Sequence, residues 1–136
     1  MNGFETQIKI LASNPLEYSP VIIFGNTQKD KETLIQKIST LKKSKVFDAE
    51  EICKSIVASI IDGNNTWKEQ FDPYDVIIID DENYLAGKTT TQEMLLSYFL
   101  TCNKAIVVIT KSEMTGNAFS SEFSSFFTGG TIIHIY

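Results

Sequence analysis

The sequence predicts an α/β protein, a three-layer αβα sandwich built around a five-stranded, mainly parallel sheet. Short, continuous apolar runs end at glycine or at polar residues, which is typical of strands buried on both faces. Longer segments with apolar residues at helical spacing separate these runs, and such alternation favours a parallel sheet. With 136 residues, the chain is long enough to bury one core, so a single domain over residues 1–136 is expected.

The first third of the chain contains three of these segments. Residues 4–12 predict a short helix that ends before the proline of Asn14-Pro15. The apolar run 21–24 predicts the first buried strand, and Gly25 stops it. Residues 31–42 carry apolar side chains at helical spacing and predict the first long helix.

The middle of the chain predicts a strand and a capped helix. Residues 45–47 form a short strand pattern, and Asp48 is expected to cap a helix that runs to about Ile61. Its apolar face is predicted to contain Ile52, Ile56 and Ile60. The remaining elements are predicted, in order, as a short helix over 66–71, a strand over 76–79, a helix over 90–102, a strand over 105–109, a helix over 117–127 and a strand over 131–136.

The charged residues exclude several functions. All 12 basic residues are lysine, and 17 acidic residues give a formal net charge of −5. Non-specific nucleic-acid binding depends on basic side chains, so direct binding to nucleic acid is not expected. A chain without arginine also cannot supply an arginine finger. No apolar segment is long enough to span a membrane, and no secretory signal is visible, so a cytoplasmic protein is expected.

The cysteines and the histidine give no sign of a metal site. Cys53 and Cys102 lie far apart without CxxC spacing and are expected as reduced thiols, although one disulfide is conceivable. The one histidine, His134, lies in an alternating apolar run and is expected as a strand residue, which makes zinc binding improbable.

The segment after the first strand resembles a phosphate-binding P-loop, G-x4-G-K-[ST], in which backbone N–H groups face phosphates at a helix N-terminus. Asp30 replaces the second glycine and Glu32 replaces the Mg²⁺-binding hydroxyl, so two negative charges are added where a polyanion would bind. If the site still binds Mg-ATP or ADP, the candidate residues are Gly25, Asn26, Thr27, Gln28, Lys29, Asp30, Lys31 and Glu32.

Polar residues also end two later strands. Asp80 and Asp81 follow the most apolar strand, where a first acid would hold Mg²⁺ and a second would orient the attacking water. Thr110 ends the next strand and suits a polar sensor of the terminal phosphate. The alternative is that these residues only end strands and cap helices. They are candidate vestigial catalytic and nucleotide-binding residues, with Asp80 as the metal ligand if nucleotide binds.

These segments together resemble the DnaA replication initiators and their AAA+ relatives. Residues 75–88, DVIIIDDENYLAGK, are similar to the family's D-V-L-L-I-D-D-I-Q-F-L-A-G-K, and Thr91-Gln92-Glu93 continues the likeness. Residues 14–25 are similar to the family segment that leads into the P-loop, and Ser121-Glu122-Phe123 lies where the family has S-R-F.

The resemblance implies the αβα core of a P-loop AAA+ ATPase, and the likeness covers neither a lid subdomain nor a DNA-binding domain. Glu122 stands where the family's arginine would reach a neighbour's ATP. Together with the two P-loop changes and the missing lid residue, this predicts a degenerate member that does not hydrolyse ATP. The expected partner is a protein, either a replication initiator or a replisome component, in the regulation of replication initiation.

Two alternatives stay open, an ATP- or ADP-binding switch and an accessory protein for single-stranded DNA. The second would use the lysines at 42, 43 and 45, which are otherwise a solvated helix end. Trp67 lies in a stretch similar to the helical insertion that initiators use near DNA, but structural packing is favoured for it. The phenylalanines at 119, 123, 126 and 127 have helical spacing and are expected mostly in the core.

Overall fold

The computed structural model describes residues 19–24, 32, 35–36, 43–80, 82–110 and 119–134. The predicted helix over 4–12 lies outside the described residues. So does most of the predicted helix over 31–42, of which Glu32, Ile35 and Gln36 are helical.

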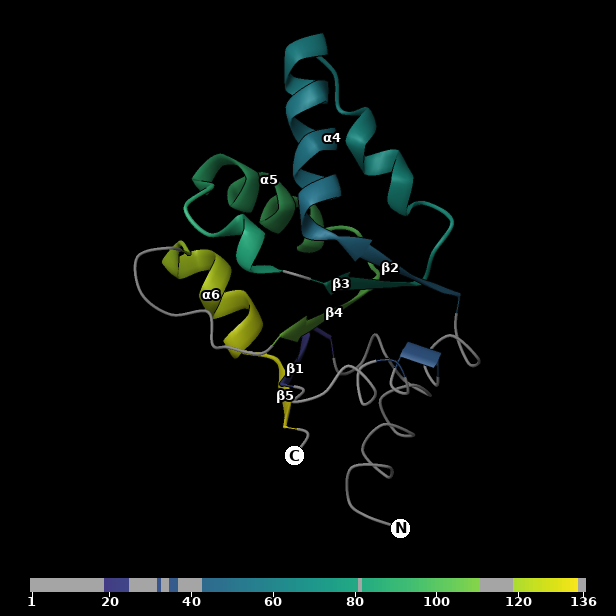
Figure 1. The fold of residues 1–136 in the computed structure, drawn as a ribbon, viewed down its shortest axis with the longest axis vertical. Coiled ribbons are helices and arrows are strands. Elements are labelled where there is room, and N and C mark those ends of the chain that lie inside the picture. The colour runs from purple at the N-terminus through teal and green to yellow at the C-terminus, as the bar shows by residue number, and fades with distance from the viewer. Residues whose placement is uncertain are drawn as a thin grey trace.

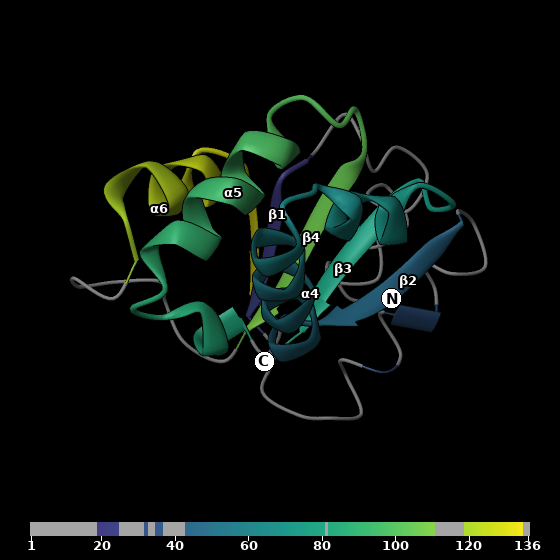
Figure 2. The same ribbon diagram turned by 90° about the horizontal axis from the view of Figure 1, so that it is seen from above.

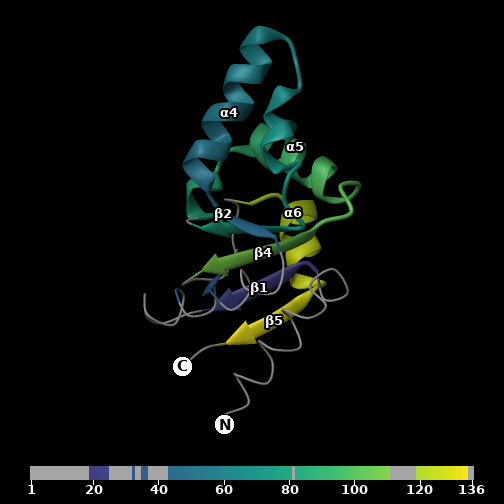
Figure 3. The ribbon, with the colours of Figure 1, turned by 90° about the vertical axis from the view of Figure 1, so that its right-hand side faces the viewer.

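Five strands form one sheet in which every pairing is parallel, in the order β2-β3-β4-β1-β5. The predicted five-stranded sheet is therefore confirmed, and all of its strands run in one direction (Figure 3). The strands are β1 (Val21–Phe24), β2 (Ser44–Asp48), β3 (Val76–Asp80), β4 (Ala105–Thr110) and β5 (Thr131–His134).

In the described part of the chain, three α-helices cover one face of this sheet (Figures 1 and 2). They are α4 (Ala49–Asp62), α5 (Thr89–Phe99) and α6 (Ser121–Thr128), and two short 3₁₀ helices, η1 (Thr66–Phe71) and η2 (Glu82–Leu85), lie between them. The η2 turn was not predicted, because four residues without apolar periodicity give no helical signal. The helix predicted over 90–102 begins one residue earlier and ends at Phe99, and the helix predicted over 117–127 begins at Ser121.

Alternate residues of the strands enter two separate apolar clusters. On the helix-covered face, Ile77 and Ile79 of β3 pack with Trp67, Phe71 and the aromatic residues of α5 and α6. On the opposite face, Val76 and Ile78 pack with neighbouring strand residues and with the partly buried Ile35. Strands buried on both faces explain why their sequences are continuous apolar runs without alternation.

The ends of α4 are formed as the sequence predicts. Asp48 is the N-cap, and its Oδ1 accepts a hydrogen bond from the Glu50 backbone N–H at 2.8 Å. Gly63 ends the helix with a φ of 71°, a left-handed conformation that glycine adopts without the Cβ clash of other residues.

One prediction about the face of α4 is wrong. Ile52 and Ile56 are buried as expected, but Ile60 is 52% exposed and Ser59 is buried in its place. The hydroxyl oxygen (Oγ) of Ser59 accepts a hydrogen bond from the Trp67 backbone N–H at 3.1 Å, so η1 covers Ser59. The far end of α4 projects away from the sheet (Figure 1), where Ile60 finds no covering element among the described residues.

Candidate functional site

The candidate site begins with the residues that end the strands at the carboxyl edge of the sheet, where ligands bind in open α/β folds. The parallel register aligns them: Asp48 pairs with Asp80, Asp80 pairs with Ile109, and Phe24 pairs with both Thr110 and His134. Asp80 and Thr110, two of the predicted polar site residues, thus come from different strands and reach one edge.

Asp80 is placed there by an apolar strand. The four residues before it, 76–79, are fully buried, and Asp80 is the first partly exposed residue of β3. Burying a carboxylate is costly, so the strand leaves the core at this residue. Asp81 lies outside the described residues.

Thr110 lies on the neighbouring strand and is 4% exposed. Its Cα is in register with Phe24, the last residue before Gly25, and the residue before it pairs with Asp80. The sheet therefore brings Thr110 between the acidic strand end and the start of the P-loop-like segment. The role of Thr110 as a sensor of a phosphate stays a prediction.

The P-loop-like segment itself, residues 25–31, lies outside the described residues. Glu32, the residue that follows it, is helical and exposed. Among the described residues no group of three or more His, Cys, Asp or Glu side chains could hold a metal ion. Asp80, the residue predicted to hold a metal ion, lies at this edge but belongs to no such group among the described residues.

A second group of predicted residues lies on α6. Ser120 caps this helix, and its Oγ accepts a hydrogen bond from the Phe123 backbone N–H at 3.1 Å. Glu122 lies in the first turn and is exposed, whereas Phe123 and Phe127 are buried. Phe126 is half-buried on the same helix, and Phe119, which precedes the N-cap and so lies outside the helix, is buried in the same cluster.

Sequence reasoning missed one connection between these two groups. The side-chain amide of Gln92, 1% exposed on α5, donates to the carbonyl of Leu85 and accepts from the backbone N–H of Ser120, each at 2.7 Å. In the sequence, Gln92 stands out only as part of the family likeness. The signal available in the sequence was a polar residue on the core-facing side of a predicted helix, because polar side chains are seldom buried without hydrogen-bond partners.

Trp67 packs as a structural residue, as expected. It is 3% exposed and meets Phe71 and Tyr98 edge-on, with ring centroids 6.4 and 5.7 Å away. Within the described part of the chain, its indole nitrogen has no hydrogen-bond partner. Burial, with smaller contributions from Cys102 and Asp72, raises the pKa of Tyr98 to about 12.

The two described lysines of the basic cluster are exposed on or beside β2. The Nζ of Lys45 lies over the rings of Phe47 and Tyr74, 5.1 and 5.9 Å from their centroids. Lys43 uses its backbone carbonyl to accept from the N–H groups of Asp75 and Val76. Lys42 lies outside the described residues.

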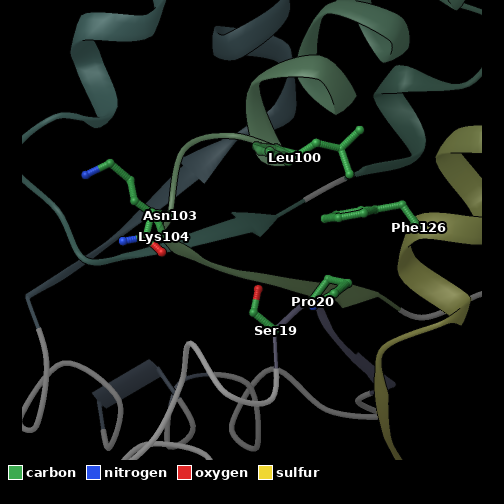
Figure 4. Close-up of a pocket in the computed structure, with 7 residues that line it drawn as sticks. Ser19, Pro20, Leu100, Asn103, Lys104 and Phe126 are labelled. Carbon is green, nitrogen blue, oxygen red and sulfur yellow. The ribbon is translucent and has the colours of Figure 1, made fainter.

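A cavity of about 230 Å³ opens at the other edge of the sheet (Figure 4). Its lining comes from the starts of β1 and β4 and from the helices above them: Ser19, Pro20, Phe99, Leu100, Asn103, Lys104 and Phe126. Because this cavity lies at the amino ends of the strands, it is separate from the edge that carries Asp80 and Thr110.

Both cysteines are free thiols, with Cys53 buried and Cys102 half-buried. No helix in the described part of the chain is long and apolar enough to cross a membrane.

Comparisons of the sequence with known proteins all identify relatives from one family. Residues 4–134 match the family model described as the bacterial DnaA ATPase domain. The chromosomal replication initiator protein DnaA of Neisseria gonorrhoeae is 31% identical over 94 residues, covering 61% of this chain and 18% of that protein. The same protein of Chlorobaculum tepidum is 30% identical over 113 residues, covering 74% of this chain and 23% of the relative. The chain thus spans about a fifth of the length of these relatives.

Solved structures show the same fold. Domain III of Thermotoga maritima DnaA superposes with a TM-score of 0.83 at 23% identity, covering 100% of this chain and 64% of that one. AMPPCP-bound DnaA of Aquifex aeolicus gives 0.79 at 22% identity, covering 96% and 44%. A replication initiator DnaA bound to AMPPCP and single-stranded DNA gives 0.78 at 21% identity, covering 99% and 47%.

Proposed function

The chain belongs to the bacterial DnaA ATPase domain family, and on this premise we propose that it is a degenerate, non-hydrolysing member that acts by contacting a replication initiator. In this proposal residues 1–136 act as one AAA+ core domain. The curated relatives are chromosomal replication initiators, which supports replication initiation as the process that it regulates.

The observation that carries the proposal is the exposed carboxylate of Glu122 in the first turn of α6. The family pattern that the sequence resembles has arginine here, directed at a neighbour's ATP. A guanidinium stabilises the charge that develops on a transferring phosphoryl group, whereas a carboxylate repels it. A chain that docks beside an initiator would therefore present the wrong charge to that initiator's nucleotide.

The altered P-loop supports the same conclusion about this chain's own site. Asp30 and Glu32 replace the glycine and the hydroxyl residue of the P-loop pattern, and Glu32 is exposed on a helix. Two carboxylates at a phosphate site oppose a polyanion, with a repulsion of about 4 kcal/mol per pair at 4 Å and an effective dielectric constant of 20. ATP hydrolysis is thus disfavoured both at this chain's own site, by Asp30 and Glu32, and at the site of a neighbouring initiator, by Glu122.

The test mixes the purified chain with full-length DnaA from the same organism. We expect the chain to lower initiator ATPase activity and assembly on origin DNA in proportion to its concentration. Glu122→Arg should relieve this inhibition, because it restores a guanidinium at the docking position. Glu93→Arg, which makes the same charge change at an exposed position of α5, is the matched control and should still inhibit. Absence of any effect of the wild-type chain on the initiator would overturn the proposal.

A nucleotide-binding switch is the second candidate, and the alignment of Asp80 and Thr110 beside the end of β1 favours it. These are the residues that would contact Mg²⁺ and a terminal phosphate. A ligand present at 100 times its dissociation constant stabilises a fold by about 2.7 kcal/mol, so thermal unfolding in millimolar Mg-ATP or Mg-ADP separates the two functions. A rise in Tm that Asp80→Asn removes would support the switch, and an unchanged Tm would support the non-hydrolysing contact domain.

A further inference from the structure

The buried amide of Gln92 joins two parts of the chain that the sequence separates. Its Nε2 donates to the carbonyl oxygen of Leu85, and its Oε1 accepts from the backbone N–H of Ser120. Both distances are 2.7 Å, and the residue is 1% exposed. The donor and the acceptor of one amide are therefore both used, and the two contacts fix its orientation.

The two hydrogen-bond partners of the Gln92 amide lie at the ends of elements beside the candidate site. Leu85 is the last residue of η2, which starts two residues after Asp80. Ser120 is the N-cap of α6, whose first turn carries Glu122. One side chain on α5 thus connects the segment after the acidic strand end with the start of the helix that presents Glu122.

Loss of the Gln92 amide should cost free energy mainly at the start of α6, where the Ser120 N–H would lose its acceptor. The N–H of Ser120 donates to Gln92, and this partly buried donor would keep part of the cost of leaving water if it lost its partner. The carbonyl of Leu85 would still accept from the backbone N–H of Lys88 at 3.0 Å. Removing the amide therefore affects the N-cap of α6 more than it affects η2.

We propose that Gln92 is a positioning residue that sets the N-terminus of α6, and with it Glu122, relative to the segment that follows Asp80. The inference rests on the proposed function in one respect, that the Glu122 surface contacts an initiator. The Leu85 carbonyl and the Ser120 N–H share this one side chain, so the amide links the end of η2 to the start of α6.

The test replaces the amide and follows hydrogen exchange in α6. Gln92→Met keeps the length of the side chain and removes both hydrogen bonds. Thr91→Val is the matched control, because Thr91 is also buried on the same turn of α5 but contacts Cys53 of α4, with 3.6 Å between Oγ1 and Sγ. We expect amide exchange at Ser120, Phe123 and Ser124 to be about tenfold faster in Gln92→Met, the factor that corresponds to about 1.4 kcal/mol, and unchanged in Thr91→Val.

A functional readout separates positioning from a purely structural role. Gln92→Met should weaken inhibition of the initiator, whereas Thr91→Val should retain it at the same temperature. Equal exchange at the three α6 amides in the two variants would overturn the positioning role. If the wild-type chain has no effect on the initiator, the proposed function fails, while the exchange experiment still decides whether Gln92 holds α6. Should Gln92→Met fail to fold, Gln92→Asn, which keeps an amide too short for both contacts, carries the same test.

Discussion

Asp48 and Asp80 lie directly opposite one another in the parallel pairing of β2 and β3, so two acidic residues end neighbouring strands at one edge of the sheet. Like charges opposite one another on adjacent strands are destabilising. Asp48 has a separate structural role, since its carboxylate caps α4. For Asp80 the role proposed above is chemical, as a Mg²⁺ ligand, so substitutions at the two positions should have different effects.

Asp80→Asn is expected to raise the free energy of unfolding by about 0.5 kcal/mol, because it removes one charge of a laterally opposed pair and keeps the shape of the side chain. Chemical denaturation at low and high salt checks this. The gain should shrink at high salt, where the repulsion is screened. A loss of stability at both salt concentrations would contradict the prediction.

Asp48→Ala is expected to lower the free energy of unfolding by about 1 kcal/mol, because the Glu50 N–H loses its capping acceptor. Asp48→Asn keeps an acceptor oxygen and also removes the charge opposite Asp80, so it is the control and should lose little or no stability. Urea denaturation of the three proteins measures the difference. The prediction is wrong if alanine and asparagine are equally destabilising.

Gly130→Ala is expected to destabilise the protein by about 2 kcal/mol, as overpacked substitutions do. A Cβ at this position would overlap the backbone carbonyl of Pro20, which also accepts from the Thr131 N–H at 2.9 Å and so holds β5 beside β1. Gly63→Ala is the comparison, because nothing lies within 4 Å of its added Cβ and only the positive φ opposes it, at about 1 kcal/mol. Thermal unfolding should rank Gly130→Ala as the less stable variant.

Trp67→Phe is expected to change stability by less than about 1 kcal/mol, because loss of apolar contact is offset by removal of a buried N–H that has no partner. Trp67→Ala should cost about 4 kcal/mol, the loss typical of a large aromatic side chain in a core. Denaturant midpoints of the two variants against wild type provide the measurement. A phenylalanine variant as unstable as the alanine variant would show that the indole nitrogen is paired in solution.

The raised pKa of Tyr98 predicts a loss of stability in alkaline solution. The folded-state pKa is about 12 against an ordinary value of 10.0, so between these values the unfolded chain loses its phenolic proton first. The free energy of unfolding should therefore be unaffected by this group below pH 10 and fall as pH rises from 10 towards 12. Tyr98→Phe should make that fall shallower, which denaturation at a series of pH values would reveal. Equal slopes for the two proteins would contradict the assignment.

The sequence by itself predicted the elements whose signal is local. The apolar runs at 21–24, 76–79 and 105–109 became β1, β3 and β4 within one residue, and Asp48 caps α4 as expected. These features depend on neighbouring residues alone, because a buried strand needs consecutive apolar side chains and a cap needs an acceptor just before a helix. The carboxyl-edge placement of Asp80 and Thr110 followed from the same pattern once the sheet was parallel.

The tertiary structure determined which elements cover each helix face and which groups the buried polar side chains contact. Periodicity gave Ile60 the same inward face as Ile56, yet the end of α4 extends beyond the sheet and η1 covers Ser59 instead. The role of Gln92 also arises only in three dimensions, because its partners Leu85 and Ser120 lie 7 residues before it and 28 residues after it. Local sequence specifies which side chains need partners, whereas the packing of distant elements determines which partners they receive.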